Sequence, residues 1–104
     1  MHAEFYQVGK YKETKVIYCL SGRIFDVAVN VNKKSTNYLK KQINLIDSKK
    51  KNFLIIPENY AHGFQALQNN TIILYLSTNC HNLKYERRIN PFDKNLKIKW
   101  PIKK

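Results

Sequence analysis

The sequence predicts an all-β domain in which antiparallel strands form a barrel or a sandwich. Short apolar or alternating segments recur, with turn residues about every 8–12 positions, and no segment shows a convincing helical period. The 104 residues suit one domain, 1–104, and an apolar content of 43% is typical of a globular protein. No window approaches the roughly 18 apolar residues of a membrane-spanning helix, so no membrane partner is expected.

Roughly six to eight strands are expected in this architecture, separated by polar or glycine-containing turns. They are 3–8, 15–21, 24–31, 38–45, 53–56, 62–67 and 71–78, with 96–100 as a further candidate. Alternation is strictest in 24–31, where Phe25 and Val27 share one face while Asp26 and Ala28 share the other. The stretch 79–93 has an irregular pattern that indicates no strand.

The stretch 53–64 is the most informative part of the chain. Its apolar run stops at Pro57, which cannot donate to a sheet ladder and therefore ends a strand. Asn59 supplies turn chemistry, and Gly63 is expected to provide a backbone conformation closed to other residues. His62 then lies just past a strand end, where a side chain in a β-barrel is either functional or a hydrogen-bonded part of a tight corner.

Three motifs resemble those of the dTDP-4-dehydrorhamnose 3,5-epimerase family. They are the segments 56–64 (IPENYAHGF), 22–29 (GRIFDVAV), and 85–87 (YER) followed by 98–101 (IKWP). The resemblance implies a cupin-type jelly roll with the active site inside the barrel, here without the N- and C-terminal segments of the family. It also implies action on, or binding of, a 4-keto-6-deoxy sugar nucleotide in deoxysugar and surface-polysaccharide biosynthesis.

The chemistry of the family is proton removal and return at the two carbons beside a C4 ketone. This reaction needs a base, a group that holds the enolate oxygen, and an acid on the opposite face of the sugar. The resemblance implies that Lys15 lies near the keto oxygen, that Tyr75 donates a proton, and that His62, Glu86 and Gln7 contact the substrate. From residue patterns alone, Lys15 could instead be an exposed strand lysine, Tyr75 a core aromatic and Glu86 a surface charge.

The chain departs from the family pattern at the catalytic base. The family places a His two residues before the Gln that matches Gln7, and this chain has Phe5 there. His2 lies an odd number of residues upstream, so a regular strand would point it to the opposite face. The Arg-Gly pair that precedes the base is absent, and the Asp that orients the base would follow the end of the chain. We therefore expect little or no epimerase activity, and an inactive remnant of the family remains an alternative.

No cofactor or metal is expected. His2, His62 and His81 are widely separated and form no His-x-His pair, the chain has no Gly-rich phosphate loop, and the epimerase family resembled here works without a metal. Cys19 and Cys80 do not make a disulfide framework and suit a reduced cytoplasm. The N-terminus also lacks the pattern of a secretory signal.

The net charge of +12 raises the question of a polyanionic partner. The lysines come in small groups at expected turns, namely 33–34, 40–41, 49–51 and 103–104, which is typical of solvated loops. A nucleic-acid partner is therefore not favoured, although a basic module for an acidic polymer remains a further alternative. A basic field would also attract a sugar nucleotide.

We expect a homodimer or a companion chain, because the missing segments would leave a strand edge unpaired.

Overall fold

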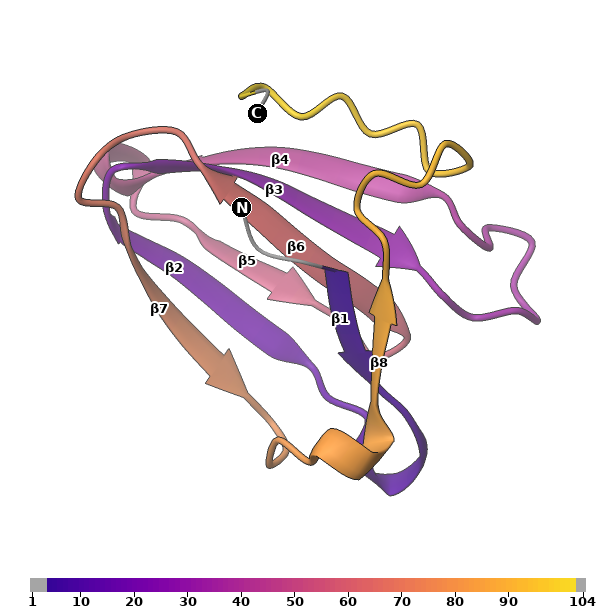
Figure 1. Ribbon diagram of the computed structural model, residues 1–104. Coiled ribbons are helices and arrows are strands. Elements are labelled where there is room, and N and C mark those ends of the chain that lie inside the picture. Colours follow the sequence, from indigo (N-terminus) through magenta and orange to yellow (C-terminus); the bar gives the residue numbers. More distant parts are fainter. Residues whose placement is uncertain (1–3, 103–104) are drawn as a thin grey trace.

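The chain folds into two antiparallel β-sheets, which confirms the all-β prediction (Figure 1). The computed structural model describes residues 4–102. The strands are β1 Glu4–Gln7, β2 Lys15–Ser21, β3 Arg23–Asn30, β4 Lys41–Asp47, β5 Phe53–Ile56, β6 Tyr60–Ala66, β7 Ile72–Ser77 and β8 Glu86–Ile89. Three short 3-10 helices, η1 Gly9–Tyr11, η2 Ser48–Lys50 and η3 Leu83–Tyr85, lie between them. Within residues 4–102, no helix has the length and apolar character needed to cross a membrane.

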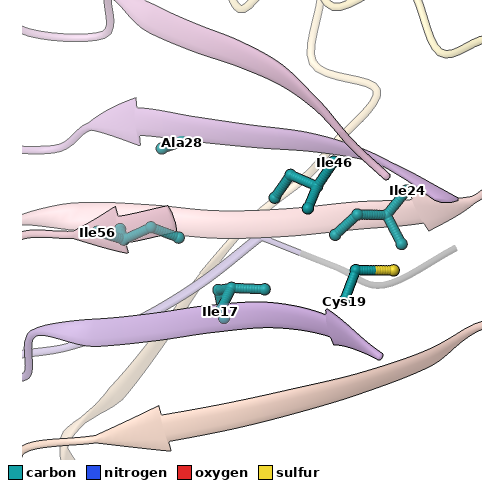
Figure 2. Close-up of a cluster of buried hydrophobic side chains, with 6 residues drawn as sticks. All are labelled: Ile17, Cys19, Ile24, Ala28, Ile46 and Ile56. Atoms are coloured by element: carbon teal, nitrogen blue, oxygen red, sulfur yellow. The ribbon is translucent and has the colours of Figure 1, made fainter. Parts of the chain in front are cut away.

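The two sheets face each other across an apolar core. The larger sheet has the strand order β4-β3-β6-β1-β8 and the smaller one the order β5-β2-β7. Figure 2 shows side chains of both sheets pointing toward one another, namely Ile17, Cys19, Ile24, Ala28, Ile46 and Ile56. Burial of these groups away from water is the main force that holds the sheets together.

A second apolar cluster covers the opposite face of the larger sheet. Phe25, Val27 and Val29 of β3 pack there against Leu96 and Trp100 of the C-terminal segment. This segment runs across the outside of the sheet near β3 and β4 (Figure 1). Both faces of β3 are therefore buried, and its alternation separates an apolar outer layer from an inner layer that contains a carboxylate.

The predicted strand 38–45 is displaced in the structure, where β4 begins at Lys41 and extends to Asp47. The backbone N–H of Leu39 donates to the carbonyl of Asn30 at 2.7 Å, and the N–H of Asn30 donates to the carbonyl of Lys40 at 3.0 Å. Leu39 itself has a left-handed conformation, with φ of 65°. Because of these turn contacts, residues 38–40 belong to the loop, and the strand begins later than the apolar pattern predicted.

The C-terminal part was also predicted wrongly. Residues 96–100 form no strand; Leu96 and Trp100 are buried anchors, and Lys97 between them has φ of 53°, which interrupts an extended chain. The irregular stretch 79–93 contains β8, which no local pattern indicated. This edge strand pairs with β1 alone, and its polar sequence reflects its place at the end of the sheet.

The turn before β6 differs from the expected one in two respects. Asn59, with φ of 67°, takes the left-handed conformation, whereas Gly63 is a regular strand residue opposite Val27. Because β6 begins at Tyr60, His62 lies within the strand rather than just past a strand end. Its neighbours in both adjacent strands therefore determine its surroundings.

Candidate active site

A cavity of about 500 Å³ lies between the two sheets. Strands β1, β6 and β8 of the larger sheet and β2 and β7 of the smaller one contribute to its wall. All five residues that the sequence suggested for the site line it: Gln7, Lys15, His62, Tyr75 and Glu86. The fold thus brings them together, while the role of each remains a prediction.

Lys15 is the first residue of β2 and is only 3% exposed. It is buried on the same face as Ile17 and Cys19, as the alternating burial along β2 shows. The alternative of an exposed strand lysine is therefore wrong. A buried ammonium group at the wall of a cavity can stabilise negative charge that develops on a bound molecule, because little water competes for it.

Tyr75 reaches the cavity from β7, where it is paired with Ile17 of β2. Its side chain is 47% exposed, which does not fit a core aromatic. The hydroxyl donates to Oε1 of Glu13 at 3.4 Å, and the same oxygen accepts a 2.6 Å hydrogen bond from the hydroxyl of Ser77. Sequence reasoning missed Glu13, which lies in the loop before β2.

This environment raises the pKa of Tyr75 well above its ordinary value. Partial burial is the largest cause, followed by the charge of Glu13 and the hydrogen bond to it. All three disfavour the phenolate. Tyr75 therefore keeps its proton at neutral pH, which is the state a proton donor needs.

His62 forms a buried pair with Asp26. Nε2 of His62 lies 2.5 Å from Oδ2 of Asp26, and the two side chains are 2% and 0% exposed. In the β3–β6 ladder, His62 is paired with Ala28 and Asp26 with Phe64, so the two residues are diagonal neighbours. One feature of the sequence could have pointed to Asp26. It is a carboxylate within an apolar strand, on the same face of that strand as Ala28.

Gln7 and Glu86 both have protein partners at the rim of the cavity. The Gln7 amide donates to the carbonyls of Tyr11 (2.8 Å) and Cys80 (3.1 Å) and accepts from the N–H of Asn82 (2.7 Å). Gln7 therefore ties the end of β1 to the neighbouring loops. Glu86 lies 3.3 Å from the exposed ring of His81.

The position that the resemblance assigns to the base, Phe5, lies in β1 as the Cα partner of His62. His2 lies outside the residues that the structure describes. Within the described part of the chain, no three His, Cys, Asp or Glu side chains gather in a way that could hold a metal ion.

Two antiparallel sheets that enclose a cavity lined by a buried lysine, a buried histidine and a tyrosine define a cupin-type barrel. The sequence model of the dTDP-4-dehydrorhamnose 3,5-epimerase family matches residues 1–104. The chain belongs to this family.

Individual relatives agree with this assignment. The dTDP-4-dehydrorhamnose 3,5-epimerase of Shigella flexneri is 35% identical over 97 residues, which are 93% of this chain and 54% of that protein. The crystal structure of the Bacillus anthracis enzyme, with TDP and PPi bound, has a TM-score of 0.95 at 26% identity and covers 98% of this chain and 58% of its own. The Legionella pneumophila enzyme, in complex with dTDP-4-keto-L-rhamnose, has a TM-score of 0.89 at 25% identity and covers 99% and 58%. The chain thus spans about half the length of these relatives.

Proposed function

We propose that this chain binds a dTDP-linked 4-keto-6-deoxy sugar in the cavity between its sheets and acts in deoxysugar biosynthesis for surface polysaccharide. The observation that carries the proposal is that Lys15, His62 and Tyr75 line one cavity. Solved relatives of the same fold hold TDP or a dTDP-4-keto sugar. The net charge of +12 would also attract a ligand that carries two phosphate groups.

In this proposal, the C4 keto oxygen lies near the ammonium group of Lys15. Removal of a proton from a carbon beside the ketone places negative charge on that oxygen, and a buried cation stabilises the charge. Tyr75 keeps its proton and can return one to the carbon. The reaction is then epimerisation through an enolate, and it requires no redox cofactor because no carbon changes its oxidation state overall.

We propose that proton exchange by this chain is slow in comparison with a family member that has a His at the base position. Position 5 is a Phe, and a side-chain base typically contributes about 10²–10⁴-fold to such a step. A binding protein without epimerase activity is the second candidate function, and the same residue favours it.

Titration of the chain with TDP and with dTDP-4-keto-6-deoxyglucose, followed by calorimetry, tests the binding proposal. We expect saturable binding of both, and weaker binding of the keto sugar by a Lys15→Met variant. Deuterium incorporation at C3 and C5 of the sugar in heavy water, followed by NMR, then separates a slow epimerase from a protein that only binds. Absence of binding to either compound would refute the proposed function.

We also propose that the chain forms a homodimer through the outer face of the β5-β2-β7 sheet. Alternate residues of these strands point away from the core and form an apolar surface: Val16, Tyr18, Leu20, Phe53, Ile55, Ile72, Leu74 and Leu76. Contiguous apolar surface of this kind usually marks an interaction site. The alternative is that a different protein chain covers this face. Measurement of the oligomeric state would distinguish the two.

We propose that residues 1–104 act as one cupin-like core domain in the cytoplasm. Two apolar clusters, one between the sheets and one outside the larger sheet, support the single unit. Cys19 and Cys80 are both free thiols, and burial raises the pKa of Cys19, which keeps it as an unreactive thiol. Free thiols fit a reducing compartment.

A further inference from the structure

We propose that His62, held by Asp26, is the proton acceptor for the carbon beside the ketone in this chain. The inference rests on the proposed function, since it assigns a role within the same cavity. His62 would be a catalytic residue that contacts the sugar, and Asp26 a positioning residue that acts through it. The resemblance assigned His62 only to substrate contact and gave Asp26 no role.

The geometry of the pair determines which nitrogen can accept a proton. In the proposed pair the carboxylate of Asp26 is the acceptor, so Nε2 of His62 donates the hydrogen of the 2.5 Å contact to Oδ2. In the neutral ring, Nδ1 then has the lone pair. A carboxylate in this position fixes the tautomer and stabilises the imidazolium that forms when the ring accepts a proton.

The burial of Asp26 strengthens this interpretation. Its side chain is 0% exposed, and its second oxygen, Oδ1, has no hydrogen-bond partner. The single contact of Asp26 with His62 is thus shielded from water, so the carboxylate can hold the ring in one orientation.

His62 lies next to the position where the family pattern places the base. It is the direct cross-strand partner of Phe5, and such Cα pairs are about 4.5–5.5 Å apart. The proton acceptor would thus lie one strand away from the position that the family pattern assigns to it. Lys15 and Tyr75 line the same cavity, so enolate stabilisation and proton return remain available.

The other carboxylates of the cavity wall are already engaged. Glu13 accepts hydrogen bonds from Ser77 and Tyr75, and Glu86 lies beside His81. The ring of His81 is 61% exposed at the rim, so water competes for its contact with Glu86. Of the ionisable side chains described in the cavity wall, His62 therefore has the surroundings best suited to a base.

The proposed step is balanced without a further reactant. Nδ1 of His62 takes the proton, the C–H electron pair becomes the carbon–carbon double bond of the enolate, and the charge resides on the C4 oxygen beside Lys15. Return of a proton from the imidazolium to the same face restores the substrate, whereas return from Tyr75 to the other face inverts the carbon. In heavy water the inverting route delivers deuterium from the exchanged hydroxyl of Tyr75, and the returning route incorporates it once the imidazolium has exchanged its proton with solvent.

The experiment compares the wild-type chain with His62→Gln and Asp26→Asn, and uses Asp93→Asn, an exposed carboxylate outside the cavity, as the control. Binding of dTDP-4-keto-6-deoxyglucose is measured first, and deuterium exchange at C3 and C5 is then measured at saturation. We expect exchange to fall by about 10²-fold or more in His62→Gln. Asp26→Asn should also lower it, by as much as about 10⁴-fold, the cost of the same change at the Asp that orients the His of a serine-protease triad, and the control should retain it.

Nitrogen NMR of the wild-type protein gives a readout that does not depend on the folding of a variant. We expect the neutral ring of His62 in the wild-type protein to carry its hydrogen on Nε2. A separate comparison with Asp26→Asn should show that the variant loses this preference. A wild-type ring with hydrogen on Nδ1 would overturn the inference.

Two further results would overturn the inference while leaving the proposed function intact. The first is binding of the keto sugar without any exchange by the wild-type chain. The second is exchange that persists in His62→Gln with binding retained. If the wild-type chain does not bind the sugar nucleotide at all, the proposed function itself fails, and the inference fails with it.

Discussion

The hydroxyl of Tyr75 lies 3.4 Å from Oε1 of Glu13, an oxygen that also accepts a 2.6 Å hydrogen bond from Ser77. Glu13 belongs to a loop that other contacts hold against the end of β7. The N–H of Thr14 donates to the hydroxyl oxygen of Thr78 at 3.0 Å, and the N–H of Thr78 donates to the carbonyl of Thr14 at 3.1 Å. The carboxylate is therefore held beside the phenol of Tyr75.

Replacement of Glu13 by Gln should lower the pKa of Tyr75. The negative charge of Glu13 disfavours the phenolate, and its removal leaves burial as the main remaining cause of the raised pKa. Ultraviolet titration of phenolate absorbance checks this, with Tyr75→Phe identifying the signal of this residue and the exposed Glu58→Gln as the control. An unchanged titration in Glu13→Gln would show that the carboxylate does not act on Tyr75.

The raised pKa of Tyr75 also predicts a loss of stability in alkali. In the unfolded chain a tyrosine ionises near pH of about 10, whereas in the folded protein Tyr75 still holds its proton there. The unfolded state therefore binds fewer protons above that pH, so the free energy of unfolding falls as the pH rises further. Denaturant unfolding at several alkaline pH values should show a smaller fall in Tyr75→Phe than in the wild type. Equal slopes would contradict the assignment.

Lys15→Met should reduce deuterium exchange by about 10²-fold or more, as expected when an oxyanion-stabilising group is lost. Stability has to be measured alongside, because removing a buried charge that has an interaction partner can itself destabilise a fold by about 3–5 kcal/mol. Exchange by NMR and thermal unfolding measure the two effects, with the exposed Lys94→Met as the matched control. A loss of exchange that accompanies unfolding would not count as support for a catalytic role.

Phe5→His should increase deuterium exchange by about 10²–10⁴-fold if position 5 is the base position of the family pattern. The increase should persist when His2 is replaced by Ala, because His2 is expected on the opposite face of a regular strand. If the wild-type chain exchanges deuterium and the His2→Ala variant does not, the strand register is shifted and His2 is the base.

Ile55→Lys should convert a dimer into a monomer. Ile55 lies on the outer face of the smaller sheet and is 63% exposed, so the core does not depend on it, whereas a charge there would be buried in the proposed interface. Light scattering at micromolar concentration is the measurement, and Lys94→Met again serves as the control. A wild-type chain that is a compact monomer under these conditions would refute the proposed dimer.

Trp100→Ala should destabilise the fold by about 3–5 kcal/mol, the usual cost of removing a large buried aromatic. Its indole packs edge-on against Phe25 at a centroid distance of 5.5 Å, and Nε1 donates to the carbonyl of Pro91 at 2.9 Å. The variant loses both contacts and uncovers the outer face of β3. Denaturant unfolding checks the prediction, and the exposed Phe92→Ala should have a much smaller effect.

The sequence by itself determined the strands whose signals are local. The segments 15–21 and 53–56 were predicted with the bounds that the structure has, because alternation and Pro57 act within a few residues. Prediction of this kind succeeds wherever neighbouring residues supply the cause. Lys15, His62 and Tyr75 were named through the resemblance to the family, and the structure places them in the wall of one cavity, while their roles stay predictions.

Only the tertiary structure decided the features that depend on distant partners. Strand β8 forms because its backbone hydrogen-bonds to β1. Leu96 and Trp100 are buried because they pack against the apolar outer face of β3. Asp26 and His62 are 36 residues apart, and neither has a local pattern that indicates the other. They meet because β3 and β6 are antiparallel neighbours in a register that places them diagonally on the inner face. Burial then removes the water that would otherwise compete for the contact between them, which no local pattern encodes.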